Sequence, residues 1–141
     1  MSNPPPPPAP QPVPELDVFK RLGEDGFARL VHAFYQQVPT DDILGPLYQQ
    51  SIAATGESME HAEERLRDFL IGRFGGPQRY IQQRGHPRLR IRHAPFHIPP
   101  TSAERWIAVM DRALTEAHIP EDVAATLRPY FRQTALFMVN R

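Results

Sequence analysis

A histidine at the end of a short segment bracketed by two prolines is the residue best suited to chemistry. The segment lies between Pro87 and Pro95, and His93 stands near its end. Pro87 suits the first turn of a helix, whereas Pro95 disfavours helical geometry at Ala94. The pattern predicts a helix of about two turns, with Leu89 on the same face as His93. An imidazole held in this way can bind a metal, or it can interact with the helix dipole.

His86 is a second imidazole in a different setting. It directly precedes Pro87, at a position where polar side chains commonly cap free N–H groups. We therefore expect a structural role for His86. The chain has no cysteine, so a metal would need histidine, carboxylate or tyrosine ligands.

Arginines without acidic neighbours surround these histidines. No Asp or Glu occurs from Arg73 to Ala103, a span that includes Arg73, Arg79, Arg84, Arg88, Arg90 and Arg92. Such a segment either faces solvent or binds an anion, which could be nucleic-acid phosphate or a carboxylate-bearing cofactor. The segment lacks interleaved aromatic residues, and acidic helices flank it, so a nucleic-acid partner is disfavoured.

The elements that must position these residues are helical. Apolar residues recur at spacings of three and four. The first predicted helix covers 24–38, and the second runs from Ser58 to the Gly75-Gly76-Pro77 stop. The third starts at Thr101, where Glu104 would complete a capping box. The last follows Pro120 and runs through Met138. Pro129 predicts a kink or a late start in the last helix.

Two connecting segments complete the all-α architecture. Thr40-Asp41-Asp42 can cap a short turn that Gly45-Pro46 stops, which leaves Tyr48 in a loop. The segment 76–98, rich in glycine and proline, is expected to lie as a wall over the core and to close a flat pocket. Short links favour packing of the four main helices as two antiparallel pairs.

Prolines dominate residues 1–14 and leave almost no large apolar side chain there. This composition predicts a disordered, extended proline-rich tail followed by one folded domain over 15–141. No stretch resembles a secretory signal or is long enough to span a bilayer. A cytoplasmic protein without a membrane partner is therefore expected.

Several of these motifs occur together in one known family. The order and spacing of Ala62 to Arg67, Gly75-Gly76-Pro77, Tyr80, the segment 85–96 and Trp106 resemble the group II truncated haemoglobins. The resemblance covers nearly everything after the tail. It implies a two-over-two helical sandwich, which is a shortened globin, and it identifies the expected anion as haem b with its propionates.

The resemblance also implies a role for individual residues. His93 matches the proximal iron ligand, and its other ring nitrogen needs a hydrogen-bond acceptor. The implied distal residues are Tyr35, Tyr48, Trp106 and the small Ala62; the implied haem contacts are Leu66, Leu89 and Phe96; and the propionate partners are Arg90, Arg92, Tyr80 and His86. His61 is expected to face solvent or a propionate.

The implied function is reversible binding of dioxygen and other diatomic ligands, by a monomer or homodimer. Phenol and indole donors would stabilise negative charge on the ligand by about 1 to 3 kcal/mol each. Oxygen transport, nitric oxide dioxygenation, peroxidase-like chemistry and sensing all remain open, as does a reductase partner. The alternative is a haem-free helical interaction module that uses the arginines for nucleic acid and the tail for a protein partner.

Overall fold

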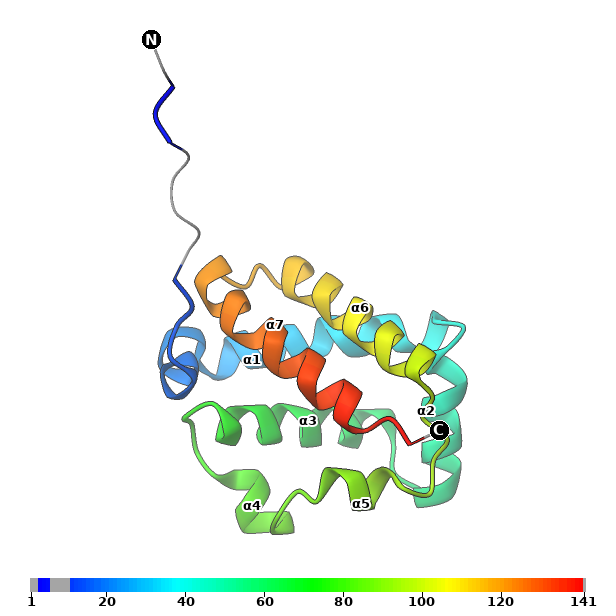
Figure 1. Ribbon diagram of the computed structural model, residues 1–141. Coiled ribbons are helices and arrows are strands. Elements are labelled where there is room, and N and C mark those ends of the chain that lie inside the picture. The colour runs from blue at the N-terminus through cyan, green and yellow to red at the C-terminus, as the bar shows by residue number, and fades with distance from the viewer. Residues whose placement is uncertain (1–2, 6–10, 141) are drawn as a thin grey trace.

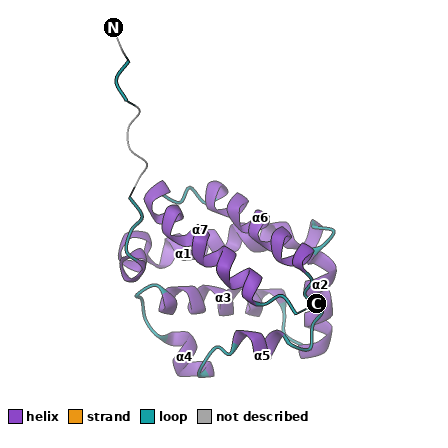
Figure 2. Cartoon of the chain, in the orientation of Figure 1, coloured by secondary structure: helices purple, strands orange, loops and turns teal. Residues whose placement is uncertain are grey.

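The computed structural model describes residues 3–5 and 11–140, apart from the side chain of Arg90. Helices account for all the regular secondary structure in these residues (Figure 2). Within these residues no strand occurs. The predicted all-α class is therefore confirmed.

Helix α1 (Val18–Gln37) follows a 3-10 turn over Glu15–Asp17. Its buried side chains include Phe27, Leu30 and Phe34, whose spacing of three and four places them on one face. The helix bends at Gly23, where φ is 70°. The predicted helix over 24–38 corresponds to the part after this bend, and the first turns were missed.

Helix α2 (Leu44–Thr55) contradicts the predicted stop at Gly45-Pro46 and the predicted loop at Tyr48. Both stop residues lie in the first turn, where the missing N–H of proline leaves no hydrogen bond unmade. Asp41 does cap the turn, because its carboxylate accepts N–H groups of Ile43 and Leu44 at 2.9 and 2.8 Å. Tyr48 is therefore held on a helix.

Helices α3 (Met59–Arg73) and α4 (Arg79–Arg84) flank the glycine pair. Ser58 caps α3 as predicted, since its hydroxyl accepts the N–H of His61 at 3.2 Å. The chain then turns through Gly75 and enters α4. The short helix α5 (Leu89–His93) follows, so the segment predicted to be a wall contains two short helices.

Helices α6 (Pro100–Glu116) and α7 (Glu121–Phe137) complete the fold. The predicted capping box at Thr101 is wrong, because α6 begins with prolines and Glu104 pairs with Arg132 at 3.2 Å. Helix α7 begins directly after Pro120 and continues through Pro129, so it has no late start.

The main helices pack as two pairs. Helix α1 packs on α3 and on α6, and α6 packs on α7. In Figure 1, α7 crosses in front of α1, while α4 and α5 run below α3. The largest buried side chains include Phe27, Phe34, Phe74 and Met110. This arrangement confirms the predicted two-over-two sandwich, with α5 at its lower edge in Figure 1.

Ordered contacts begin before residue 15. Val13 is buried in the core, its N–H donates to the Asp122 carbonyl at 3.2 Å, and its own carbonyl accepts the Thr126 hydroxyl. An apolar side chain among the prolines therefore packs against α7, just before the expected start of the folded domain at residue 15. Within the described residues, no helix combines the length and apolar character needed to cross a membrane.

Candidate functional site

Helix α5 presents His93 but starts later than the sequence predicts. Its preceding residue, Arg88, adopts a left-handed conformation with φ of 46°, so the helix cannot begin at Pro87. The Arg88 N–H donates to Nδ1 of His86 at 3.1 Å. His86 thus has the expected local structural role in the turn that precedes α5.

The imidazole of His93 is fixed by its own helix. Its Nδ1 lies 2.7 Å from the Leu89 carbonyl oxygen. Because a carbonyl can only accept, Nδ1 carries the proton and Nε2 keeps its lone pair. Burial lowers the pKa of His93, and the neighbouring Arg65 and Arg92 lower it further against the effect of the Leu89 hydrogen bond. A neutral imidazole with a free Nε2 is the form that binds metals.

Three aromatic side chains from different helices form a hydrogen-bonded group. The Trp106 indole N–H of α6 donates to the Tyr48 hydroxyl of α2 at 3.2 Å. Tyr35 of α1 also hydrogen-bonds to Tyr48, and their rings meet edge to face with centroids 5.8 Å apart. Burial raises the pKa of Tyr48 to about 12 and raises that of Tyr35 as well. Both hydroxyls therefore stay protonated donors at neutral pH.

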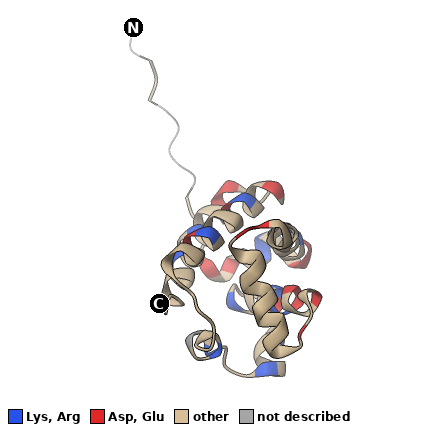
Figure 3. Ribbon diagram, turned by 90° about the vertical axis from the view of Figure 1, so that its right-hand side faces the viewer, with Lys and Arg blue, Asp and Glu red and all other residues tan. Residues whose placement is uncertain are grey.

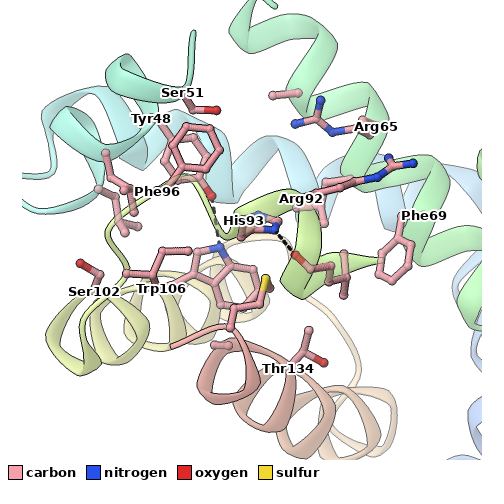
Figure 4. Close-up of a pocket in the computed structure, with 18 of the residues that line it drawn as sticks. Tyr48, Ser51, Arg65, Phe69, Arg92, His93, Phe96, Ser102, Trp106 and Thr134 are labelled. Carbon is pink, nitrogen blue, oxygen red and sulfur yellow. Dashed lines mark hydrogen bonds between the residues drawn. The ribbon is translucent and has the colours of Figure 1, made fainter. Parts of the chain in front are cut away.

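His93 and the aromatic group line one cavity of about 450 Å³ (Figure 4). The structure brings almost all predicted site residues to its walls. Those lining it are Tyr35, Tyr48, Ala62, Leu66, Tyr80, Leu89, Arg92, His93, Phe96 and Trp106. His86 and His61 are exposed and are not among the lining residues. The side chain of Arg90 lies outside the described part of the chain.

Arg92 is already bound by protein groups. Its guanidinium donates to the Tyr80 hydroxyl at 2.7 Å and to the carbonyls of Arg84 and His86 at 3.2 and 3.4 Å. Tyr80 and Arg92 therefore form one unit at the cavity wall, which joins α4 to α5. Their predicted contact with a propionate would have to use the remaining donors.

Arg65 is a lining residue that the sequence analysis missed. It lies on α3, one turn after Ala62, and pairs with Glu57, which also hydrogen-bonds to Arg84 at 3.5 Å. The spacing from Ala62 could have revealed Arg65, because residues three apart share a helix face. Glu57 gave no such signal, since its partners are brought to it only by folding.

The composition of this cavity fits a haem. Apolar walls such as Leu66, Leu89 and Phe96 suit a porphyrin, and Arg65 offers a positive charge for its carboxylates. Among the described residues, no group of three or more His, Asp or Glu side chains could hold a metal ion. His93 alone provides a nitrogen ligand here, which suits an iron whose other ligands come from an organic ring.

Comparisons with known proteins agree with this geometry. A family model described as bacterial-like globin matches residues 17–140. Two-on-two hemoglobin-3 of Arabidopsis thaliana is 35% identical over 128 residues, which cover 90% of this chain and 71% of that protein.

Solved structures give the same result. The truncated oxygen-avid haemoglobin from Bacillus subtilis is similar with a TM-score of 0.79 and 28% identity, covering 87% of this chain and 98% of that one. The group II truncated hemoglobin from Bacillus anthracis has a TM-score of 0.79 and 30% identity, covering 87% and 90%. The chain therefore belongs to the bacterial-like globin family, as a group II truncated haemoglobin, and shares that family's haem-based binding of small diatomic gases.

Proposed function

We propose that this chain holds haem b through Nε2 of His93 and binds dioxygen reversibly beside Tyr35, Tyr48 and Trp106. One observation carries the proposal. The hydrogen bond from Nδ1 of His93 to the Leu89 carbonyl orients a neutral imidazole in the same cavity as the three aromatic donors. When bound, the haem would supply an iron centre that takes diatomic gases.

The aromatic group would supply polar contacts to the ligand. The Tyr48 oxygen accepts from Trp106 and hydrogen-bonds to Tyr35, so its lone pairs are engaged within the protein. Its single proton can then point into the cavity and donate to a ligand with negative character. In this arrangement Trp106 and Tyr35 orient the Tyr48 donor.

Cationic and polar side chains would bind the propionates. Arg65 and Arg92 line the cavity, and Tyr80 is bonded to Arg92. We assign the propionates to these three residues, with Arg65 added to the set that the sequence predicts. The propionate contacts of Arg90 and His86 stay predictions.

The oriented Tyr48 donor supports slow ligand release. A charge-assisted hydrogen bond stabilises a ligand by about 1 to 3 kcal/mol, which favours a long-lived complex. The relative from Bacillus subtilis is named oxygen-avid. We therefore favour sensing, nitric oxide dioxygenation or peroxidase-like chemistry with a separate reductase over rapid oxygen transport.

The arginine-rich segment has partners within the protein, which argues against the nucleic-acid alternative. Arg73 pairs with Glu15 at 3.0 Å, Arg79 pairs with Glu24, and Arg84 pairs with Glu57. These carboxylates come from outside the segment, and acidic and basic positions are interspersed over the helices in Figure 3. A cytoplasmic location and a monomeric or homodimeric state stay predictions.

Spectroscopy of the purified full chain tests the proposal. With haem b added, the ferrous protein should give an intense Soret band that shifts on exposure to dioxygen. His93→Ala should lose this spectrum, because it removes the iron ligand. His97→Ala is the matched control, since His97 is exposed and is not among the cavity-lining residues. Normal haem retention and an unchanged iron spectrum in His93→Ala would falsify ligation by His93.

A further inference from the structure

We propose that Asn140 is a positioning residue for His93. Its side chain joins the end of α5, and the loop that follows, to the segment directly after α7. The inference rests on the proposed ligation of haem iron by His93. It assigns a specific task to a residue 47 positions away in the sequence.

The contacts of Asn140 all converge on one segment. Its Nδ2 donates to the Phe96 carbonyl at 2.8 Å and to the His93 carbonyl at 3.3 Å. Its Oδ1 accepts the Ile98 N–H at 2.9 Å, and its own backbone N–H donates to the Ile98 carbonyl at 3.0 Å. One residue thus holds the chain from His93 to Ile98.

Helix α5 needs such an external contact. It has five residues, and helices this short are unstable by themselves because nucleation costs more than a few hydrogen bonds return. Its last carbonyls have no partner further along the helix. The His93 carbonyl instead accepts from the Phe96 N–H at 3.0 Å and from Asn140. Asn140 therefore stabilises the helix end that carries the imidazole.

The other side of α5 is held by a different residue. Arg92 joins it to Tyr80 and to the Arg84 carbonyl of α4, as described above. His93 stands between these two attachments. With Arg92 fixing α5 to α4 and Asn140 fixing it to the end of α7, the imidazole has little freedom to shift relative to the cavity.

The contacts require an amide rather than a carboxylate. Asn140 presents its N–H donors to two carbonyls and its oxygen to one backbone N–H, so all three partners agree with one orientation of the group. Asn140→Asp keeps the size and the acceptor, but it places a carboxylate oxygen against the carbonyls of His93 and Phe96. Asn140→Ala removes all of the side-chain contacts and introduces no charge.

The test uses the full-length chain loaded with haem b, as wild type, Asn140→Ala, Asn140→Asp and the control Gln133→Ala. Gln133 is an exposed residue of α7, the helix that precedes Asn140 in the chain. Resonance Raman spectra of the ferrous, ligand-free protein report the iron–histidine stretching band. Hydrogen exchange measures the amides of residues 94–98 other than Pro95, and the amides of α1 and α6 report global stability.

Both Asn140 variants should broaden or shift the iron–histidine band and accelerate exchange in 94–98 by about tenfold, as expected when ordinary hydrogen bonds are lost. Gln133→Ala should match wild type. The proposal is overturned if the band and the exchange of 94–98 are unchanged, or if exchange accelerates equally in α1 and α6. An Asn140→Ala chain that does not fold, beside an Asn140→Asp chain that behaves as wild type, also overturns it. Loss of the iron–histidine band in His93→Ala tests the proposed function separately.

Discussion

Tyr48 occupies the centre of the hydrogen-bonded group in the cavity, so its hydroxyl is the best single atom for testing ligand stabilisation. Tyr48→Phe removes the acceptor for Trp106 and the proton available to the ligand. We expect dioxygen to dissociate about 10 to 100 times faster, which corresponds to the loss of about 1 to 3 kcal/mol. Stopped-flow release of dioxygen measures this.

Tyr130→Phe is the matched control for this substitution. Tyr130 also lines the cavity and loses the same atom, but its hydroxyl interacts with Thr134 and Arg73 instead of Tyr48. Its release rate should stay close to that of wild type. If the two variants accelerate release equally, the effect comes from the cavity as a whole and Tyr48 has no special role.

The same hydroxyl sets an expectation for pH. Burial raises the pKa of Tyr48 to about 12, so its phenol remains protonated and able to donate throughout the neutral and mildly alkaline range. Dioxygen release should therefore show no change due to Tyr48 between about pH 6 and 10. An acceleration toward pH 10 that disappears in Tyr48→Phe would contradict this.

At the residue level, the predictable site residues were those with a recognisable local pattern. The proline-bracketed segment indicated His93 either as a metal ligand or as a residue that interacts with the helix dipole, and the resemblance favoured the ligand. The resemblance then supplied Tyr35, Tyr48 and Trp106, because isolated aromatic residues on apolar stripes are indistinguishable from ordinary core. Asn140 lay beyond both kinds of reasoning, since its partners are defined only when the end of α7 packs beside α5.

At the scale of elements, the start of α2 depends on Asp41. Its carboxylate accepts N–H groups of Ile43 and Leu44 and receives Arg105 of α6 at 3.1 Å. Asp41→Ala should lower the free energy of unfolding by about 1 to 2 kcal/mol, because a helix cap and a link between helices are lost. Urea denaturation at pH 7 measures this. Asp42→Ala is the control, since that carboxylate is 83% exposed and should change stability by less than about 0.5 kcal/mol.

The Asp41 contribution should also depend on pH with a definite sign. Burial acts to raise the pKa of this carboxyl, but the Leu44 and Ile43 N–H groups and Arg105 lower it below its usual value of 3.8 overall. The unfolded chain therefore binds the proton more readily than the folded one. The stabilisation is complete above the unfolded pKa and is lost as pH falls through the folded pKa. The difference between wild type and Asp41→Ala should accordingly shrink in strong acid.

Helix α2 also shows where local patterns mislead. Gly45-Pro46 predicts a stop only if a helix precedes it, and the same pair is compatible with a first turn. The choice depends on Asp41, whose capping bonds start the helix just before the pair. The predicted stop at this pair is therefore wrong, since these bonds place it in the first turn of α2.

At the scale of the whole molecule, the short links between the main helices predicted their packing as two pairs, and the resemblance implied the two-over-two sandwich. The close contact between the N-terminal segment and the turn after α3 could not be predicted. There, the Phe19 N–H donates to the Phe74 carbonyl at 3.0 Å, and the backbone of Leu16 lies against Gly75. No pattern in the sequence links these positions, which meet only when α1 packs on α3.

This contact makes Gly75 a sensitive position. Its φ is 100°, in the left-handed region, and an added Cβ would lie 2.2 Å from the Leu16 carbonyl oxygen. Gly75→Ala should therefore lower the free energy of unfolding by about 3 kcal/mol or more, since a backbone clash adds to the conformational cost.

Gly56→Ala is the control, because Gly56 also has a positive φ of 72° but nothing within 4 Å of an added Cβ. It should cost only about 1 to 2 kcal/mol. Urea denaturation at equal haem saturation compares the two, because bound haem itself stabilises the fold. Equal losses in the two variants would mean that the Leu16 backbone can move away from residue 75 without lowering the free energy of unfolding. The N-terminal segment would then not fix the turn between α3 and α4 that leads to α5.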